Sequence, residues 1–218
     1  MKPILASLAL LALSAAAFAQ TPPPATPEPA PAEAPAPKPA TVRVTLQTAE
    51  GPIGLELEKE RAPVTTANFL RYVDQKRFDG ATFYRAMKLT PDGAYGLIQG
   101  GTRNDPKTTL KPIAHEPTTK TGLSHVDGAI SMARGAPGSA TGDFFISIGE
   151  LKSLDADPTK PGDNLGFAVF GRVIEGMDVV RKIMAAPTSP TAGEGVMKGQ
   201  MIAAPIRIVS ARRSPPAP

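Results

Sequence analysis

Eight short apolar runs that resemble β-strands limit what this chain can fold into. They are residues 42–46, 53–57, 81–89, 95–99, 129–133, 144–148, 167–173 and 206–210. Segments rich in glycine and proline separate the runs, as turns separate the strands of an all-β protein. A sheet that closes on itself leaves no strand edge open to aggregation. We therefore expect a mainly β domain, built as a closed antiparallel barrel.

Only two segments show a helical period. In residues 63–74, Pro63 stands in the first turn, where proline is tolerated, and apolar residues recur at helical spacing. In residues 177–186, Asp178 lies in the first turn and Pro187 ends the run. The sequence thus predicts two helices that accompany the barrel.

The N-terminal segment 1–19 is typical of a cleaved export signal. Lys2 supplies the positive start, residues 4–18 form an apolar run, and Ala17-Phe18-Ala19 is a small-x-small cleavage site. We expect cleavage after Ala19 and delivery to the periplasm, or to the medium where a cell has no outer membrane. A membrane anchor is the alternative, but the run is shorter than the roughly 20 apolar residues that a span needs. We therefore expect no stable membrane insertion after cleavage.

Residues 20–40 consist almost entirely of proline and alanine, with Glu28, Glu33 and Lys38 as their only charges. Such a segment cannot bury a core, and its prolines favour an extended polyproline conformation. We interpret it as a disordered linker, with a recognition motif as the less favoured alternative. The folded domain then spans residues 41–213, and a proline-rich tail, residues 214–218, follows it.

Composition argues against several classes of function. The chain has no cysteine, which excludes a disulfide framework, a thiolate metal site and a cysteine nucleophile. A net charge of +4 could suggest nucleic acid, but the basic residues are scattered along the chain. With three tyrosines and no tryptophan there is little to stack on bases, so we expect no nucleic-acid partner.

Familiar catalytic machinery is also missing from the sequence. His115 and His125 lack a carboxylate or a second histidine at metal-ligand spacing, so we expect no metal site and interpret both as surface or capping residues. No phosphate-binding glycine loop and no G-x-S-x-G motif occurs. Nucleotide-dependent and hydrolase functions are therefore unsupported.

One cation lies in a strand pattern among apolar residues. Strand alternation places Phe83, Arg85 and Met87 on one face. A cation in such surroundings needs a partner. The spacing alone fits either an arginine at the barrel rim that pairs with a carboxylate, or a catalytic cation.

Five separated segments carry a resemblance to a known family. They are "ATFYRAM", which contains Arg85, then "LIQGG", which contains Gln99, and further along "GAISMARG", "FFISIG" and "GFAVFGRVIEGMDVV". In content and order they resemble the cyclophilins, a family of peptidyl-prolyl cis-trans isomerases, and in particular its exported bacterial members. Each segment alone is weakly specific, but the combination is highly specific and spans most of residues 41–210.

The resemblance implies an eight-stranded antiparallel barrel capped by two helices, with the active site on the outside of the barrel wall. Arg85 takes the place of the family's catalytic arginine. The implied substrate-binding residues are Phe83, Tyr84, Leu97, Gln99, Ala133, Arg134, Asp143, Phe145, Leu154 and Phe167. Leu97, Phe145 and Leu154 fall where the family lines its proline pocket, although ordinary barrel core remains the alternative for them. The implied enzyme acts on proline-containing polypeptides without a cofactor, and we expect it to be a monomer.

The chain departs from the family pattern at several positions. Gly96 stands where a pocket aromatic is usual, Tyr84 replaces a histidine, and Asp143 replaces a glutamine. Whether Tyr95 substitutes for the missing aromatic stays open. These changes motivate an alternative, a proline-segment binding module or holdase chaperone without turnover. Because the family's arginine and glutamine are both present, we favour an isomerase that acts on exported proteins.

Overall fold

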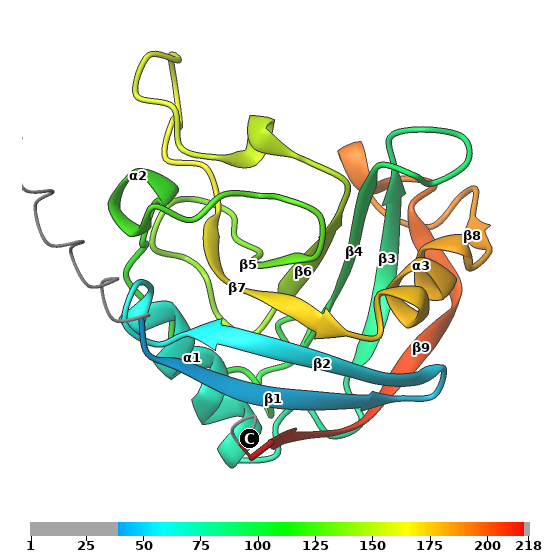
Figure 1. Ribbon diagram of the computed structural model, residues 1–218. Helices are drawn as coiled ribbons and strands as arrows, with labels where there is room; N and C mark the ends of the chain where they lie inside the picture. The colour runs from blue at the N-terminus through cyan, green and yellow to red at the C-terminus, as the bar shows by residue number, and fades with distance from the viewer. Residues whose placement is uncertain (1–38, 216–218) are drawn as a thin grey trace, which may run out of the picture. The chain divides into compact units, whose positions relative to one another are not determined.

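The protein forms a closed antiparallel β-barrel, seen in a computed structural model that describes residues 39–215 (Figure 1). Its strands are β1 (Thr41–Thr48), β2 (Gly51–Glu58), β3 (Thr82–Lys88), β4 (Gly96–Gly101), β5 (Ala129–Met132), β6 (Phe144–Ile148), β7 (Ala168–Glu175), β8 (Thr188–Ser189) and β9 (Met201–Arg213). Eight of them pair in the order β1-β2-β7-β5-β6-β4-β3-β9, and β9 pairs with β1 to close the ring. The two-residue β8 adds to the side of β9. The predicted mainly β barrel is confirmed.

The predicted strands lie where the apolar runs placed them. The run at 144–148 has the same bounds as β6, while β9 begins five residues before the run predicted at 206–210. Runs of alternating apolar residues thus located every strand of the ring. The predicted export signal and most of the predicted linker lie outside the described residues.

Within residues 39–215, three α-helices accompany the barrel. The helices α1 (Pro63–Asp74) and α3 (Met177–Ala185) are the two that the helical periods predicted, and Figure 1 shows them on different sides of the strands. A third, α2 (Thr118–Thr121), is a single turn that ends at Gly122 in the left-handed conformation. We did not predict α2, because four residues are too few to show a period.

Aromatic side chains fill the barrel interior. Phe69 of α1 contacts Phe78, Phe144 and Phe170, with ring centroids 4.9 to 5.3 Å apart. Tilted and edge-on pairs at such distances are favourable beyond the area that they bury. The helix therefore seals the barrel with the same side chains that form the core.

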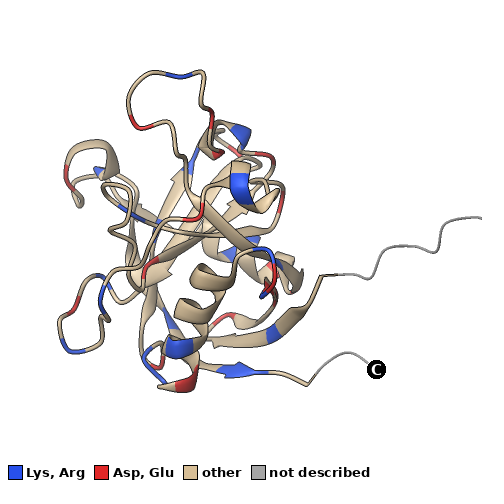
Figure 2. Cartoon of the chain, turned by 90° about the vertical axis from the view of Figure 1, so that its left-hand side faces the viewer, with Lys and Arg blue, Asp and Glu red and all other residues tan. Residues whose placement is uncertain are grey.

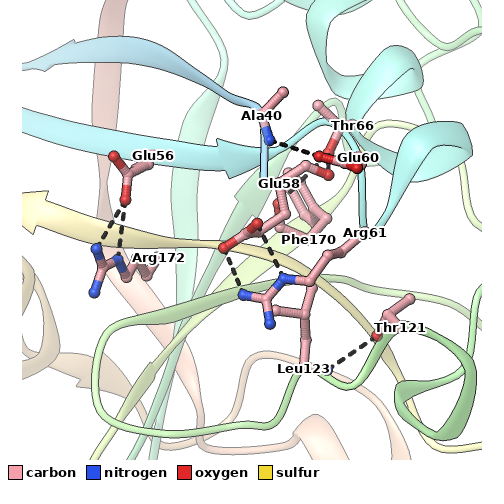
Figure 3. Close-up of polar contacts among 10 residues, drawn as sticks. All are labelled: Ala40, Glu56, Glu58, Glu60, Arg61, Thr66, Thr121, Leu123, Phe170 and Arg172. Carbon is pink, nitrogen blue, oxygen red and sulfur yellow. Dashed lines mark hydrogen bonds and ion pairs between the residues drawn. The ribbon is translucent and has the colours of Figure 1, made fainter. Parts of the chain in front are cut away.

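The outer wall around β2 and β7 is polar. Glu56 of β2 pairs with Arg172 of β7 at 2.8 Å (Figure 3). At the end of β2, Glu58 binds Arg61 through two hydrogen bonds of 2.6 and 3.1 Å, and its backbone carbonyl accepts the Thr66 hydroxyl of α1. The contacts of Glu58 fix the path of the chain from β2 into α1. Together with the Glu56–Arg172 pair, they place charged side chains on this part of the outer wall.

Charged residues of both signs are interspersed over the face in Figure 2. Within residues 39–215, every helix is too short or too polar to cross a membrane.

Candidate active site

A small apolar cluster lies on the outside of the barrel wall. Leu97 of β4, Phe145 of β6 and the nearby Leu151 are 6%, 3% and 4% exposed. They form a cluster separate from the barrel interior, and Met87, Ala133, Leu154 and Phe167 pack against it. Alternation explains this placement, because the neighbours of Phe145 along β6 point into the core. The residues predicted for a proline pocket therefore come together, and the barrel-core alternative is wrong for them.

A β-bulge in β3 decides which side chains face this cluster. Phe83 pairs with Gly100 and Arg85 pairs with Gln99, so Tyr84 is one extra residue in β3. A bulge breaks the alternation of faces. Our expectation that Phe83, Arg85 and Met87 share a face is therefore wrong. Phe83 is fully buried in the barrel interior, away from the outer surface where we had placed it as a substrate-binding residue.

Arg85 lies on the outer face and is held by two neutral amides. Its Nη1 donates to Gln99 Oε1 at 2.8 Å. Its Nε and Nη2 both donate to Gln200 Oε1, at 2.9 and 2.7 Å. Within residues 39–215 no carboxylate forms an ion pair with it, which contradicts the rim-arginine alternative. Burial lowers the pKa of the Arg85 guanidinium, yet arginine stays charged at any ordinary pH.

The hydrogen-bond count at Arg85 leaves a donor for a ligand. A guanidinium has five N–H groups. Three of them are bound to the two amides, and Nη2 also approaches the Met87 sulfur at 3.5 Å. In the described part of the chain, the second N–H of Nη1 has no acceptor. A half-buried charge thus presents one free donor beside the apolar cluster.

Tyr84 fixes the orientation of the Gln99 amide. Gln99 Nε2 donates to the Tyr84 hydroxyl at 2.8 Å, so the amide oxygen must face Arg85. Burial, with a smaller effect of the Asp143 charge, raises the pKa of Tyr84, which keeps the phenol neutral. Arg103 lies over the Tyr84 ring with 5.1 Å between Cζ and the ring centroid. The predicted residues Tyr84 and Gln99 therefore form one network with Arg85.

Asp143 supports a turn at the edge of the site. Its Oδ1 accepts the Arg103 backbone N–H at 2.8 Å, and the N–H groups of Thr102 and Asn104 also point to it. Arg103 and Asn104 both have positive φ, which is uncommon outside turns. Burial raises the pKa of Asp143. The carboxylate borders a cleft of about 630 Å³ that Tyr84, Gln99 and Ala133 also line.

Arg134 is engaged within the protein. Its guanidinium donates to the Asp163 carboxylate at 2.6 and 3.1 Å and to the Gly166 carbonyl. Its Cζ lies 5.2 Å from the ring centroid of Phe167, which in turn meets Phe145 edge-on. The side chain thus holds the segment before β7 against the apolar cluster. Predicted as a substrate contact, Arg134 lies at the rim of the cleft, but its donors have protein partners.

His125 lies directly behind the apolar cluster. Its ring stacks on Phe145 at 5.6 Å, with 8° between the planes, and the side chain is 0% exposed. Nδ1 donates to Asp155 at 2.6 Å, and Nε2 accepts the Ser131 hydroxyl at 3.0 Å. Our interpretation of His125 as a surface or capping residue is wrong. A single histidine before a strand carries no sequence signal of this burial.

The buried histidine predicts a pH dependence of stability. Burial lowers the pKa of His125 below the unfolded value of about 6.5, so the unfolded chain takes up the proton first as the pH falls. The contribution of neutral His125 to the free energy of unfolding is therefore complete above about pH 7. It decreases below pH 6.5, by at most about 1.4 kcal/mol per pH unit. Urea unfolding at pH 7.5 and 5.5 measures it. The decrease in the free energy of unfolding between these two pH values should be smaller in His125→Gln and unchanged in His115→Gln. An equal decrease in both variants would contradict the role of His125.

The missing pocket aromatic is not replaced by Tyr95. Tyr95 is 48% exposed and lies against Gly149, outside the apolar cluster. Gly96 has φ +150°, and a Cβ there would collide with the Met87 carbonyl oxygen. Met87 instead packs against the cluster from β3, where it pairs with Leu97. The backbone therefore closes this side of the pocket.

Comparison with known proteins decides the family. The family model described as cyclophilin type peptidyl-prolyl cis-trans isomerase/CLD matches residues 42–213. The chain belongs to the cyclophilins. This cyclophilin is 37% identical to a peptidyl-prolyl cis-trans isomerase of Acinetobacter baylyi over 77% of its own length and 82% of that protein. It is 35% identical to peptidyl-prolyl cis-trans isomerase B of Escherichia coli over 66% and 85% of the two chains.

Solved structures confirm the fold. The crystal structure of a cyclophilin-type isomerase of Cryptosporidium parvum matches 82% of this chain and 100% of its own, with a TM-score of 0.64 at 20% identity. A second structure of that protein, in the presence of the dipeptide Ala-Pro, gives a TM-score of 0.63 over 80% and 99% of the chains. The family model and the curated relatives identify the cyclophilin described here as a peptidyl-prolyl cis-trans isomerase, a class of enzyme that acts on proline-containing polypeptides.

The sequence did not reveal Gln200 as part of the site. It lies in a glycine-rich turn before β9, 115 positions after Arg85 in the chain. Only the pairing of β9 with β3 brings the two together. Within residues 39–215 no three His, Asp or Glu side chains are grouped as a metal site.

Proposed function

We propose that this cyclophilin accelerates rotation about X-Pro bonds by a hydrogen bond from Arg85 to the prolyl nitrogen of the twisted peptide. One observation carries the proposal. A half-buried guanidinium without a carboxylate partner in the described residues keeps a free N–H beside an apolar cluster, the kind of surroundings that a proline ring requires. An arginine paired with a carboxylate would have lost most of its capacity to stabilise the twisted peptide, because the carboxylate would offset its charge.

The physics of the reaction explains why such a donor suffices. Rotation breaks amide resonance against a barrier of roughly 18–20 kcal/mol and requires no covalent chemistry. As the bond twists, the nitrogen loses conjugation and gains a lone pair that can accept a hydrogen bond. A fixed donor aimed at this atom stabilises the twisted state and not the planar ones. Interactions of that kind lower a barrier.

The free energy needed for catalysis is within the range that the Arg85 donor and the orientation of the substrate can supply. A rate increase of about 10⁴ corresponds to about 5.5 kcal/mol. One preorganised donor in a partly dry site contributes about 3–4 kcal/mol, and orientation of the substrate can supply the rest. Burial of a proline ring against Leu97 and Phe145 contributes about 1.5–3 kcal/mol, so short peptides should bind weakly.

The alternative, a binding module without turnover, lacks a supporting observation. Gly96 and Asp143 motivated it, but the backbone closes the pocket at Gly96, and Asp143 supports a neighbouring turn. An isomerisation assay on the full mature chain tests the proposal. Turnover of a single-proline peptide is expected, and peptide binding without turnover would favour the module.

We also propose that the protein is exported and assists the folding of proteins in the periplasm as a monomer. The support is the sequence of residues 1–19, with its charged start, apolar run and small-x-small site. Mass spectrometry of the exported protein is expected to show a chain that begins at Gln20. Retention of residues 1–19 would contradict export by cleavage. Light scattering of that sample measures the oligomeric state.

A further inference from the structure

We propose that Gln200 is a positioning residue that orients the Arg85 guanidinium for isomerisation. The inference rests on the role proposed for Arg85. One acceptor, Gln200 Oε1, receives both N–H groups on one edge of the guanidinium, at 2.9 and 2.7 Å. Gln99 binds the remaining terminal nitrogen at 2.8 Å. Two amides thus fix the plane of the guanidinium and the direction of its free N–H.

Gln200 is itself held on both sides. Its carbonyl accepts the backbone N–H of Ala86, the residue after Arg85, at 2.9 Å. Its side-chain Nε2 donates to the Val196 carbonyl at 2.8 Å, within the short 3₁₀ turn η2 (Gly195–Met197). The backbone bond sets the distance from β3, and the side-chain bond turns the amide oxygen toward Arg85. The residue is therefore a fixed support and not a chance contact.

The chemistry of an amide suits this position. A carboxylate at the same place would bind the guanidinium edge equally well, but it would also cancel the charge that stabilises the twisted state. A neutral amide orients the arginine and leaves its charge available. This predicts that Gln200→Glu, which has nearly the same shape, impairs turnover while its carboxyl group is ionised.

Gln200→Ala tests the positioning directly. Without the acceptor, the guanidinium can rotate away, and a misplacement of about 1 Å can cost up to 10²-fold in rate. We expect kcat to fall by at least about tenfold with KM within about twofold, because the free donor acts only in the twisted state. Lys198→Ala, in the same turn but exposed, is the matched control and should keep both parameters. A Gln200→Ala enzyme with wild-type kcat would overturn the proposal.

The pH profile of Gln200→Glu provides a readout that a structural role would not move. Exchange NMR on a peptide without titratable side chains is expected to show about tenfold lower kcat at pH 7.5. Recovery is expected only as the glutamate protonates below about pH 4, because the neighbouring guanidinium lowers the pKa of the new carboxyl group. The cleft of about 630 Å³ next to the site is bordered by Tyr84, Arg103, Arg134, Asp143 and Glu194, so the wild-type profile is the reference. A Gln200→Glu enzyme with wild-type kcat at pH 7.5, where the glutamate is ionised, would overturn the inference.

Arg85→Ala separates this inference from the proposed function. In an Arg85→Ala background, the further change Gln200→Ala should have no effect on kcat, because its only role is to hold that side chain. If Arg85→Ala leaves kcat unchanged, the proposed function itself fails. If Arg85→Ala lowers kcat but Gln200→Ala does so equally in both backgrounds, only the positioning role fails.

Discussion

Replacement of Arg85 by alanine is expected to lower turnover by about 10²–10³-fold, the usual loss when one preorganised donor to a transition state is removed. The barrel should stay folded, because the side chain opens onto the outer wall and its partners are two amides that water can solvate. A coupled isomerisation assay measures turnover, and circular dichroism measures the fold. The melting temperature should change little.

The matched control is Arg172→Ala. Arg172 is also an arginine on the outer wall, but it is exposed, pairs with Glu56 of β2 (Figure 3) and is not part of the apolar cluster. Exposed ion pairs contribute about 0–1 kcal/mol, so this variant should keep its turnover. An Arg85→Ala enzyme that loses activity only in proportion to unfolding would show that Arg85 is structural. Unchanged turnover in a folded Arg85→Ala enzyme would remove it from catalysis.

Gly96→Ala is expected to destabilise the protein by about 2–6 kcal/mol, the sum of backbone strain and overpacking. The residue has φ +150°, and its Cβ would meet the Met87 backbone carbonyl, which cannot move without disruption of the β3–β4 ladder. Such a loss is a large part of the about 5–15 kcal/mol that stabilises a typical domain. Urea unfolding measures it. A phenylalanine at this position, which is larger than alanine, should destabilise the protein further.

Gly122→Ala is the control for the backbone contribution. Gly122 also has a positive φ, +67°, but nothing lies within 4 Å of a Cβ built there. Alanine at this position should cost only about 1–2 kcal/mol. Equal losses at Gly122 and Gly96 would show that the carbonyl contact at Gly96 has no effect and that the pocket could accept a side chain there.

Local sequence patterns predicted the barrel because each strand shows its own short run of apolar residues bounded by turn residues. Family resemblance placed Phe145 and Leu97 in a pocket, and in the structure the two share a cluster while their strand neighbours point into the core, as alternation requires. The same rule failed at Phe83, since a bulge at Tyr84 shifts the faces and leaves no mark in the apolar pattern. Periodicity thus predicts faces only where the ladder is regular.

The rest of the site depends on contacts between distant segments. Gln200 reaches Arg85 through the pairing of β9 with β3, and the turn that holds it has no apolar period. His125 lies under Phe145 because Asp155, 30 positions later, returns to bind its ring. Family resemblance predicted the arginine and the glutamine of the site. It did not predict the supports that fix them, which only the fold brings into contact.

The most direct test of the central claim separates binding from rotation in one experiment. Exchange NMR on a single-proline peptide, with wild type and Arg85→Ala at several concentrations, gives both the dissociation constant and the exchange rate of the bound peptide. Because the Arg85 donor acts on the twisted state, we predict a dissociation constant within about threefold of wild type and bound-state exchange at least about 10²-fold slower. A variant that loses affinity but rotates the bound peptide at the wild-type rate would contradict this mechanism.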